Sequence, residues 1–408
     1  MFKTIRNFAL VFVVIVILCF SLMVVTYTLP TDNAYESIVA DADLFSNLHF
    51  STIPGYDTTS LDLYSDSIIL SEICYYNHNV SLFDNSMSNY GTRDGHDFGK
   101  FVGGNESVIK DYARYWHGNL VVLKVLFLFL DYNAIKLLEL FFEVVMFIFI
   151  VKLMYGNNLK NYIIPFILSL FLIHPEVIGL SMQYFAMFNI MLISVCILLK
   201  FKEKLFKNNR LLYYFLAVGM LANFFDLTTY PLITLGIPAI FYLLLEKDQN
   251  SIKQNVIKIL LFGIVWSVGF IGMWISKWII SSIILNKNVV ANALEQFSWR
   301  VSSAEFSRFD AILANVLIYH KKVYLIIFVL IGIYYIKRLI NARNKITLDG
   351  IKQIAPFLCI ALMPFAWYFV LSNHSYIHFW FTYRDLLIFF FAVMCSLEYL
   401  IIKTCDNC

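Results

Sequence analysis

The stretch FALVFVVIVILCFSLMVVTY, Phe8–Tyr27, decides the fold class of this chain. It contains no charged residue, and it directly follows a segment that carries Lys3 and Arg6. A membrane-spanning helix needs roughly 20 apolar residues, whereas a cleavable signal sequence has an apolar core of about 7–15 residues and a small-residue cleavage site. The stretch is longer than such a core and has no obvious cleavage site, so we expect an uncleaved transmembrane anchor over residues 1–29.

The composition extends this apolar character to the whole chain of 408 residues. Hydrophobic residues make up 60%, charged residues only 14%, and the mean hydropathy is +0.71. Soluble domains carry about 25% charged residues, so the composition excludes a soluble enzyme and a disordered chain. Most of the seven cysteines lie inside apolar runs, which argues against a secreted disulfide scaffold. The net charge of +3 is too small to indicate a nucleic-acid partner.

Further apolar runs predict a polytopic, all-α membrane protein with about ten transmembrane helices. A polar outer segment, residues 30–133, follows the first span; we expect it to hold amphipathic and interfacial helices. Residues 134–408 then form a transmembrane bundle with outer loops at 174–184, 225–230, 280–322 and 372–385. The runs that follow the first span are 134–154, 162–173, 185–199, 211–224, 231–245, 257–279, 323–336, 354–371 and 386–402.

The distribution of charge gives the orientation, because cytoplasmic loops of membrane proteins are enriched in Lys and Arg. With about ten spans, this rule places both termini in the cytoplasm. It places all eight histidines on the outer side or at its rim. We therefore expect a multi-pass protein of the cell membrane whose reactive face is extracytoplasmic. The basic residues assigned to the inner side are Lys152, Lys160, Lys200, Lys202, Lys204, Lys207, Arg210, Lys247, Lys253, Lys258, Lys337, Arg338, Arg343, Lys345, Lys352 and Lys403.

The segment LDLYSD places two carboxylates, Asp62 and Asp66, one helical turn apart in the first outer segment. Two such groups against an apolar surface have split or raised pKa values, which suits a general base. The alternative is a solvated helix face on which Asp62 caps the helix N-terminus.

The segment YARYWHG, residues 112–118, lies where the outer segment returns to the membrane. Arg114 offers a planar donor for phosphate, and His117 titrates near neutral pH. The rings of Tyr112, Tyr115 and Trp116 could face a sugar or a lipid headgroup. An aromatic belt at the membrane surface is the competing interpretation.

Two later outer connections carry further polar groups. In NFFDLTTYP, Asp226 either binds substrate or caps its own turn. In NHSYIHFWFTYRD, His374, His378 and Arg384 predict a cationic cluster for a lipid phosphate, with an interfacial belt as the alternative. The His–x3–His pair lacks a third ligand in sequence, so we predict no metal site there.

Two more groups of charges leave alternatives open. One helical stripe inside a span carries Lys136, Glu139 and Glu143. These residues form either a structural ion pair or a proton or ion relay. The loop from about Asn286 to His320 could be a lid over an outer cavity or a solvated amphipathic helix; it carries Glu295, Arg300, Glu305, Arg308 and Asp310. The chain has no Walker, dinucleotide-binding, GxSxG or HExxH motif, so ATP-driven transport and serine hydrolysis are not indicated.

The layout resembles GT-C glycosyltransferases, integral-membrane enzymes that use polyprenyl-phosphate-linked sugars. The likeness covers most of the chain as architecture: one span, a long acidic outer loop and then many closely spaced spans. The segments DLYSD, YARYWHG, NFFDLTTYP and NHSYIHFWFTYR also resemble bacterial membrane proteins of surface-polysaccharide loci. The family's paired acidic signature after the first span is absent, since Asp41 and Asp43 are isolated.

The resemblance implies inverting transfer of a sugar from a polyprenyl phosphate to a glycan or glycolipid acceptor on the outer membrane face. Asp62 or Asp66 would be the base. Preorganised cations would stabilise the leaving phosphate, and the remaining polar groups would bind substrate. A divalent cation, magnesium or manganese, stays open as a cofactor, and no nucleic acid is expected. The implied phosphate-binding residues are Arg114, His374, His378 and Arg384, and the implied substrate-binding residues are Tyr112, Tyr115, Trp116, His117 and Asp226.

Two other classes of function compete with this one. A lipid-linked sugar flippase or small-solute transporter would need polar residues at mid-depth in several spans and internal repeats, and the sequence offers Glu143 and little else. A structural subunit of a polysaccharide assembly complex would use the long outer segment as a docking domain.

Overall fold

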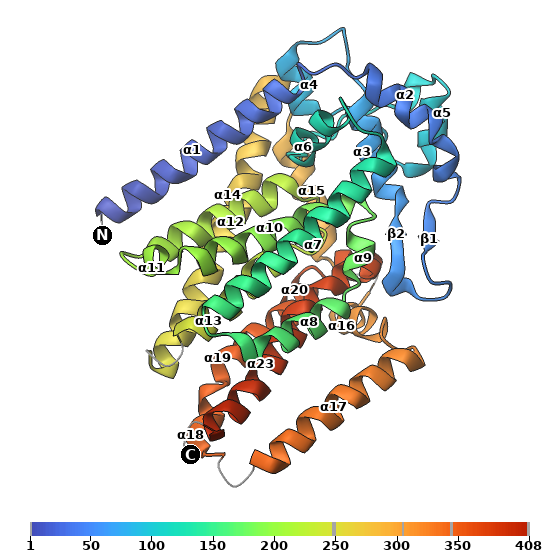
Figure 1. Cartoon of the computed structure of the whole chain (residues 1–408). Coiled ribbons are helices and arrows are strands. Elements are labelled where there is room, and N and C mark those ends of the chain that lie inside the picture. The colour runs from blue at the N-terminus through green and yellow to red at the C-terminus, as the bar shows by residue number, and fades with distance from the viewer. Residues whose placement is uncertain (1, 247–249, 304–305, 343–345, 406–408) are drawn as a thin grey trace.

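The chain folds almost entirely into helices, which confirms the all-α fold class (Figure 1). The computed structural model describes residues 2–246, 250–303, 306–342 and 346–405. The predicted inner-side and lid residues Lys247, Glu305, Arg343 and Lys345 lie outside these ranges. One short hairpin interrupts the helices, with β1 (His49–Ser51) antiparallel to β2 (Ser60–Asp62) and His49 opposite Asp62.

Six helical segments within the described ranges are long and apolar enough to cross a membrane, which supports a multi-pass membrane protein. Three apolar helices are shorter, as the abrupt ends of their apolar runs predict. α7 (Tyr132–Gly156) is long but carries Lys136, Glu139 and Glu143. The six segments are α1 (Phe2–Thr26), α10 (Met182–Lys200), α14 (Ile252–Leu285), α17 (Lys322–Ala342), α18 to α20 (Leu348–Val370) and α22 to α23 (Phe379–Ile402). The shorter helices are α8 (Ile163–Phe171), α12 (Arg210–Phe225) and α13 (Ile233–Glu246).

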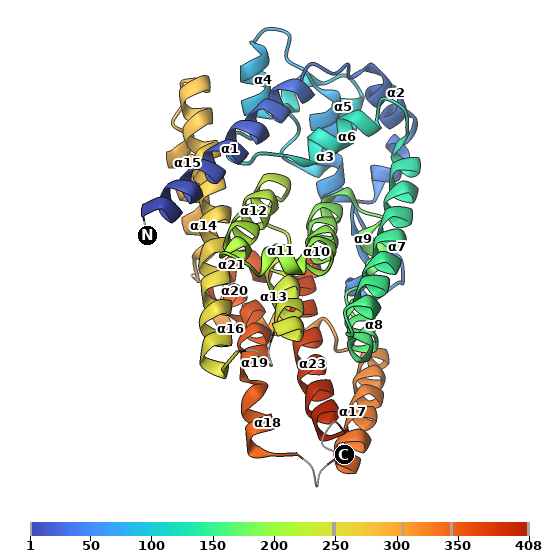
Figure 2. The same ribbon diagram turned by 60° about the vertical axis from the view of Figure 1, so that its left-hand side comes forward.

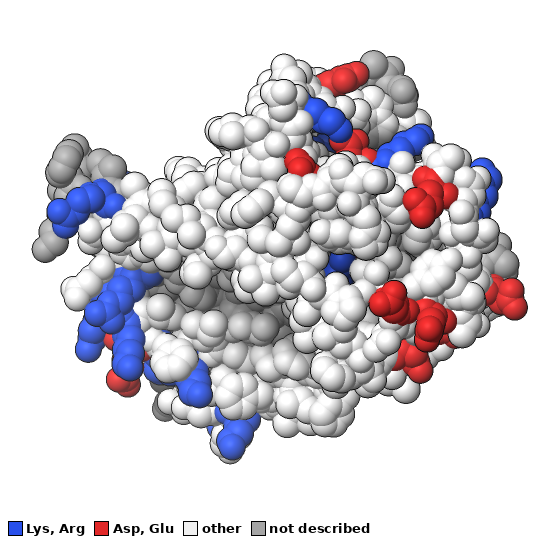
Figure 3. All heavy atoms as spheres, turned by 90° about the horizontal axis from the view of Figure 1, so that it is seen from above, with Lys and Arg blue, Asp and Glu red and all other residues white. Residues whose placement is uncertain are grey.

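Charged side chains gather at two sides of the molecule. In Figure 3, Lys and Arg dominate the left side and most visible Asp and Glu lie on the right, with an almost uncharged surface between them. An uncharged band between charged ends is the surface that a bilayer requires.

The centre of the bundle is formed by α10, α12, α13, α14 and α23, whereas α1 and α17 lie on its flanks (Figure 2). α12 and α14 approach each other most closely, because two glycines remove the side chains between them. A Cβ atom added at Gly219 would lie 2.2 Å from the carbonyl oxygen of Trp266, and one at Gly269 would lie 2.4 Å from that of Leu216. Small residues allow this close backbone contact in membrane helices.

A helical subdomain covers one end of the bundle, at the top of Figure 1. α3 lies at its centre and buries Ile69, Leu70 and Ile73 together with the polar Ser71 and Glu72. Its neighbours surround it, so α3 is buried on nearly every face. The subdomain comprises α2 (Asp32–Ala40), α3 (Leu63–Cys74), α4 (Leu82–Ser88), α5 (Phe98–Val102) and α6 (Asn119–Leu126).

Short helices in the later connections pack against one another at the same end of the bundle. α15 and α16 both contact α21, and α15 also contacts α14. These contacts bring the loop after α14 and the connection before α23 together. The helices are α9 (Pro175–Ile178), α15 (Val289–Val301), α16 (Arg308–Leu317), α21 (Ser372–Ile377) and η7 (Tyr383–Asp385).

We expect Gly219→Ala to destabilise the protein by about 1–3 kcal/mol, because the new methyl group overlaps the backbone of α14. The matched control is Gly263→Ala on α14, where an added Cβ has no neighbour within 4 Å. The control should be neutral or slightly stabilising, since alanine favours helix more than glycine does. Thermal unfolding in detergent measures both, and equal unfolding temperatures would contradict the close packing of α12 on α14.

Candidate functional site

Three of the segments singled out in the sequence meet around Arg300, near the C-terminal end of α15. Its guanidinium lies 5.4 Å from the centre of the Tyr115 ring, and Nη1 donates a hydrogen bond to the Tyr115 hydroxyl. Asp226 acts electrostatically on the same guanidinium. The positive charge of Arg300 in turn acts on both His374 and His378. Arg300 therefore joins the YARYWHG, NFFDLTTYP and NHSYIHFWFTYRD segments into one cluster.

Of the two histidines of this cluster, His374 is buried and His378 is half-buried, and both have a lowered pKa. Their ring centres are 4.8 Å apart, and Nε2 of His374 lies 2.7 Å from the carbonyl oxygen of Thr228. Burial, then the charges of His378 and Arg300, hold the pKa of His374 well below its usual value. Burial and the Arg300 charge lower the pKa of His378 to about 4. The positive charge of the cluster thus comes from arginine, and the histidines offer neutral hydrogen-bonding groups.

In the neutral imidazole of His374, the hydrogen bond to Thr228 determines which ring nitrogen carries the proton. A carbonyl oxygen only accepts, so Nε2 must donate to Thr228, and Nδ1 keeps its lone pair. No hydrogen-bond partner faces this buried Nδ1 atom within the described chain. Nδ1 of His374 is consequently an acceptor without a donor.

Arg384, at the start of the last span, is completely buried among tyrosines. Its guanidinium carbon lies 4.1 Å from the ring centre of Tyr184, 4.9 Å from that of Tyr383 and 6.0 Å from that of Tyr230. Within the described residues, Nη1 donates to the carbonyl oxygen of Trp380 at 3.0 Å, whereas Nε and Nη2 form no hydrogen bond. The aromatic faces stabilise the cation and leave two N–H groups available to a ligand.

No carboxylate lies within salt-bridge distance of Arg300 or Arg384 in the part of the chain that the structure describes. Buried arginines are normally paired with an anion, because an unpaired buried charge costs several kcal/mol by order of magnitude. The arrangement can therefore bind an anionic group, and arginine suits phosphate best.

Asp226 shows the capping role that its position in a tight turn predicts. Both carboxylate oxygens accept from the backbone N–H of Thr229, at 3.0 and 2.9 Å, and Oδ1 also accepts from the Thr229 hydroxyl at 2.6 Å. Burial raises the pKa of Asp226 to about 6. The residue both shapes the turn and faces the Arg300 cluster.

Asp62 and Asp66 lie where α3 meets the start of α10. Asp62 caps α3 by accepting from the backbone N–H of Ser65 at 3.0 Å, which is the capping role considered from the sequence. Burial, and then the charge of Asp62, raise the pKa of Asp66 to about 7.

Asp66 accepts hydrogen bonds from the start of α10 and from Tyr132 at the start of α7. It accepts from the backbone N–H groups of Met182 and Gln183 at 3.1 and 3.0 Å. The hydroxyls of Tyr132 and Ser181 donate at 2.9 and 3.3 Å. Helix N–H groups at an N-terminus lack partners within the helix, so Asp66 supplies them from another segment.

Tyr184 on α10 connects this carboxylate pair with the arginine cluster. Its hydroxyl donates to the carbonyl oxygen of Ser60, two residues before Asp62, at 3.3 Å. Its ring is the one nearest to Arg384, and its carbonyl oxygen accepts from the hydroxyl of Tyr230 at 2.5 Å. The DLYSD segment therefore lies against the same tyrosine as the last connection.

Trp116 and His117 point away from this cluster and fasten the outer subdomain. The indole N–H of Trp116 donates to the carbonyl oxygen of Met273 on α14 at 2.8 Å. Nδ1 of His117 lies 2.8 Å from Oε2 of Glu72, while Oε1 binds Arg93 at 2.9 Å. Burial lowers the pKa of His117. Burial raises the pKa of Glu72, but His117 and Arg93 outweigh it and leave that pKa below its usual value.

Tyr112 and Arg114 lie on the outer side of the subdomain. The Tyr112 ring contacts the guanidiniums of Arg93 and Arg114, at 4.2 and 4.4 Å from its centre. Nη1 of Arg114 reaches Asn292 on α15 at 3.5 Å. Tyr115 joins the Arg300 cluster by a hydrogen bond, and Tyr112 acts electrostatically on the same guanidinium.

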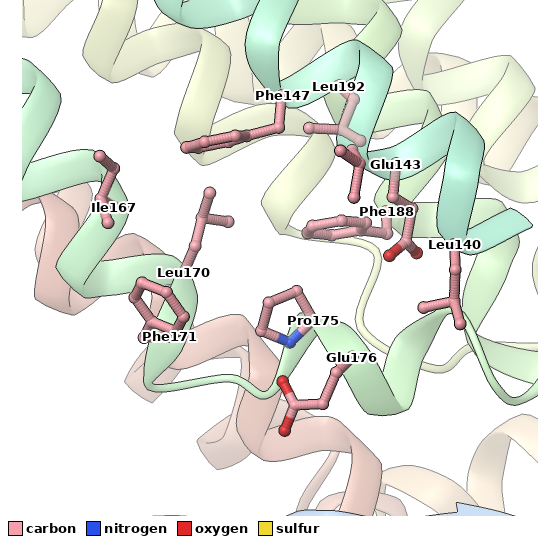
Figure 4. A pocket seen from close by; sticks show the side chains of 11 residues that line it. Leu140, Glu143, Phe147, Ile167, Leu170, Phe171, Pro175, Glu176, Phe188 and Leu192 are labelled. Atoms are coloured by element: carbon pink, nitrogen blue, oxygen red, sulfur yellow. The ribbon is translucent and has the colours of Figure 1, made fainter.

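The acidic stripe of α7 lies along apolar grooves. Glu139 hydrogen-bonds to Asn189, Lys136 lies 4.0 Å from the centre of the Tyr132 ring, and no salt bridge joins these three described side chains. Glu143 lines a groove of about 300 Å³ between α7, α8, α9 and α10, with Glu176 at the same end (Figure 4). The ion pair considered from the sequence is therefore not formed within this stripe.

No cluster of three or more His, Cys, Asp and Glu side chains that could hold a metal ion occurs in the described ranges.

Asp66→Asn should lower the free energy of unfolding by about 1–3 kcal/mol at mildly alkaline pH. Both carboxylate oxygens accept hydrogen bonds, and the amide would direct an N–H group at a donor. Asp131→Asn is the control, because Asp131 only caps α7 through Ala134 and asparagine caps equally well. Thermal unfolding of both variants tests this, and an unchanged Asp66→Asn would show that the start of α10 does not need the carboxylate.

Comparison of the chain with known protein families, with characterised proteins and with solved structures gives no match. The interpretation of the site therefore rests on the chain's own residues.

Proposed function

We propose that this protein is a membrane glycosyltransferase. It transfers a sugar, with inversion, from a polyprenyl-phosphate donor to a glycan or glycolipid acceptor on the outer membrane face. The observation that carries the proposal is the buried Arg384, which within the described residues has two N–H groups without a hydrogen-bond acceptor and no carboxylate within salt-bridge distance.

The arginine cluster would bind the phosphate of the donor. When the bond between the sugar and the phosphate breaks, negative charge grows on the phosphate oxygens. Preorganised donors in a buried site stabilise such charge far better than water does. Arg384 and Arg300 would supply that stabilisation, and the tyrosine faces around Arg384 keep the guanidinium oriented.

Asp62 is the proposed base. The charges of Asp62 and Arg384 both act on Tyr184, whereas the carboxylate of Asp66 accepts from the backbone at the start of α10. In the step, the acceptor oxygen forms a bond to the anomeric carbon as the bond from that carbon to the phosphate oxygen breaks. The electron pair leaves with the lipid phosphate, and the acceptor's proton passes to the Asp62 carboxylate.

Arg384→Met and Arg300→Met should each weaken binding of polyprenyl phosphate about tenfold or more and reduce sugar transfer by a larger factor. Each substitution removes a charge-assisted contact of about 1.5–3 kcal/mol. Arg308→Met, on the exposed start of α16, is the matched control and should bind like the wild type. Tryptophan fluorescence titrated with polyprenyl phosphate reports binding without knowledge of the sugar. Wild-type affinity in both variants would exclude this phosphate site.

Asp62→Asn should abolish transfer of sugar from polyprenyl-phosphate hexoses while leaving lipid-phosphate binding intact. Asparagine keeps the N-terminal cap of α3 and cannot accept the proton. Radiolabelled sugar transfer in detergent measures the loss, and unfolding temperature verifies the fold. Retained transfer in this variant would assign the base to another carboxylate, with Asp226→Asn as the next substitution to measure.

A lipid-linked sugar transporter is the second candidate, and Glu139 and Glu143 along the α7 grooves are the observation that favours it. A transporter would move a fluorescent lipid-linked sugar across reconstituted vesicles and would catalyse no transfer. Substituting Glu143 by glutamine would then affect movement more than substituting Arg384 would.

A further inference from the structure

A second constellation of polar side chains lies outside the arginine cluster, at the elbow between α8 and α9. Oε1 of Glu176 lies 2.7 Å from Nδ1 of His174, and Nε2 of His174 lies 2.6 Å from the hydroxyl of Tyr324 on α17. That hydroxyl is also 2.5 Å from Oγ1 of Thr58. Four residues from three distant parts of the sequence thus form one hydrogen-bonded row.

The backbone holds His174 in a conformation that few residues adopt. Its φ and ψ are 57° and 68°, in the left-handed region, and Pro175 follows it directly. Non-glycine residues in this region are uncommon and concentrate at functional sites. The strained elbow aims the imidazole between Glu176 and Tyr324.

The direction of each hydrogen bond follows from what each group can donate. An ionised carboxylate only accepts hydrogen bonds. Burial raises the pKa of Glu176, but the hydrogen bond and the charge of His174 outweigh burial and leave that pKa below its usual value. Nδ1 of His174 must then carry the proton, so in the neutral imidazole Nε2 is the acceptor. Tyr324 therefore donates to Nε2, and its oxygen accepts from the hydroxyl of Thr58.

This order is the one that activates a hydroxyl nucleophile. A histidine, oriented by a carboxylate on its far nitrogen, faces the O–H group whose proton it can remove. Thr58 adds a donor that stabilises the phenolate oxygen as the proton leaves.

The row opens onto a cavity. Tyr324, His174 and Tyr56 line a space of about 620 Å³ whose remaining walls are apolar. The apolar lining includes Phe171, Leu172, Val323, Ile327 and Ile331. A pocket with apolar walls and a few convergent polar groups is a typical site for a small apolar ligand.

We propose that Tyr324, with His174 as its base and Glu176 as the positioning residue, is the nucleophile of a separate acyl-transfer site that takes lipid esters. The Tyr324 oxygen forms a bond to the ester carbonyl carbon, and the bond from that carbon to the alcohol oxygen breaks. The phenol proton passes to Nε2 of His174 and then to the departing alcohol. The products are the alcohol and an acyl-tyrosine, from which a second hydroxyl compound or water removes the acyl group.

This site and the proposed glycosyltransferase site consist of different residues. An experiment that disproves one proposal therefore leaves the other standing. Arg384 acts electrostatically on Glu176 but contributes no atom to the row, and neither Asp62 nor Arg300 lines the cavity.

The test uses the full-length protein in detergent with p-nitrophenyl decanoate, followed by peptide mass spectrometry. We expect a decanoyl group on Tyr324, formed at least about tenfold faster than on Tyr56, which lines the same cavity but has no histidine partner among the described residues. His174→Gln should reduce labelling of Tyr324 about tenfold or more, and Glu176→Gln severalfold. Tyr324→Phe, which keeps the ring, should remove the label altogether.

A rapidly hydrolysed adduct would escape detection, so hexadecanesulfonyl fluoride serves as a second probe. Its product, in which a bond from the tyrosine oxygen to sulfur replaces the bond from sulfur to fluorine, is not turned over. Unfolding temperatures of the variants separate loss of reactivity from loss of fold, and Thr58→Val gives an independent variant with reduced reactivity.

The pH profile separates a base from a structural partner. With His174 present, the labelling rate should depend less steeply on hydroxide concentration than in His174→Gln, because a base at Nε2 removes the phenol proton. In His174→Gln the rate should keep rising into the alkaline range, as for an ordinary phenol. Among the described residues, the charged or titratable groups that face the row include Glu176, Tyr56, Tyr319 and Tyr383, and Glu143 and Arg384 act on Glu176. Equal labelling of Tyr56 and Tyr324 with both probes, or an unchanged rate in His174→Gln, would overturn the proposal.

Discussion

The free-energy cost of burying the positive charge of Arg384 away from water governs how the side chains around it are arranged. Arg384 is completely buried at the outer end of the last span, and its surroundings are aromatic rings and backbone carbonyl groups. Coulomb energies grow as the effective dielectric constant falls, so a charge in this setting interacts strongly with any anion that arrives. The hydroxyls of Tyr184, Tyr230 and Tyr383 reach across to Ser60, Tyr184 and Thr58, which holds the rings in place around the guanidinium. The aromatic shell therefore stabilises the cation and ties the outer hairpin to the bundle.

A comparable solution fastens the outer subdomain to α14. Lys277 is buried in that helix, and its ammonium donates to the carbonyl oxygen of Met87 on α4 at 3.0 Å. The indole of Trp116 donates to α14 about one helical turn earlier, at the carbonyl oxygen of Met273. Residues 30–133 are therefore attached to α14 by hydrogen bonds to backbone carbonyl groups. These hydrogen bonds do not require a bound ligand.

The sequence predicted the helical class, the short α8 and the segments that carry the polar groups, because apolar run length and residue type are local properties. It could not predict which of those polar groups share a site. Trp116 and His117 are adjacent to Tyr115, yet only Tyr115 reaches Arg300, since the left-handed backbone at His117 turns the chain between them. The two aspartates of DLYSD share a helical turn, but one caps its own helix and the other caps α10.

The residues that the sequence missed have an equally physical explanation. Tyr184 lies in an apolar span, where a tyrosine gives no signal of its own, and Arg300 lies in a loop of mixed charge. Each becomes significant only when the fold brings it to a partner more than a hundred residues away, as with Arg300 and Tyr115. Spatial pairing of this kind is set by helix packing, which the order of residue types does not encode locally.

The glycine contact between α12 and α14 has a mechanical consequence. Two backbones in direct contact, with no side chains between them to change rotamer, can hardly slide or tilt against each other. The centre of the bundle is then a stationary frame. Movement is then left to the segments that contact this frame through side chains, among them α15, which packs on α14 and holds Tyr115 through Arg300.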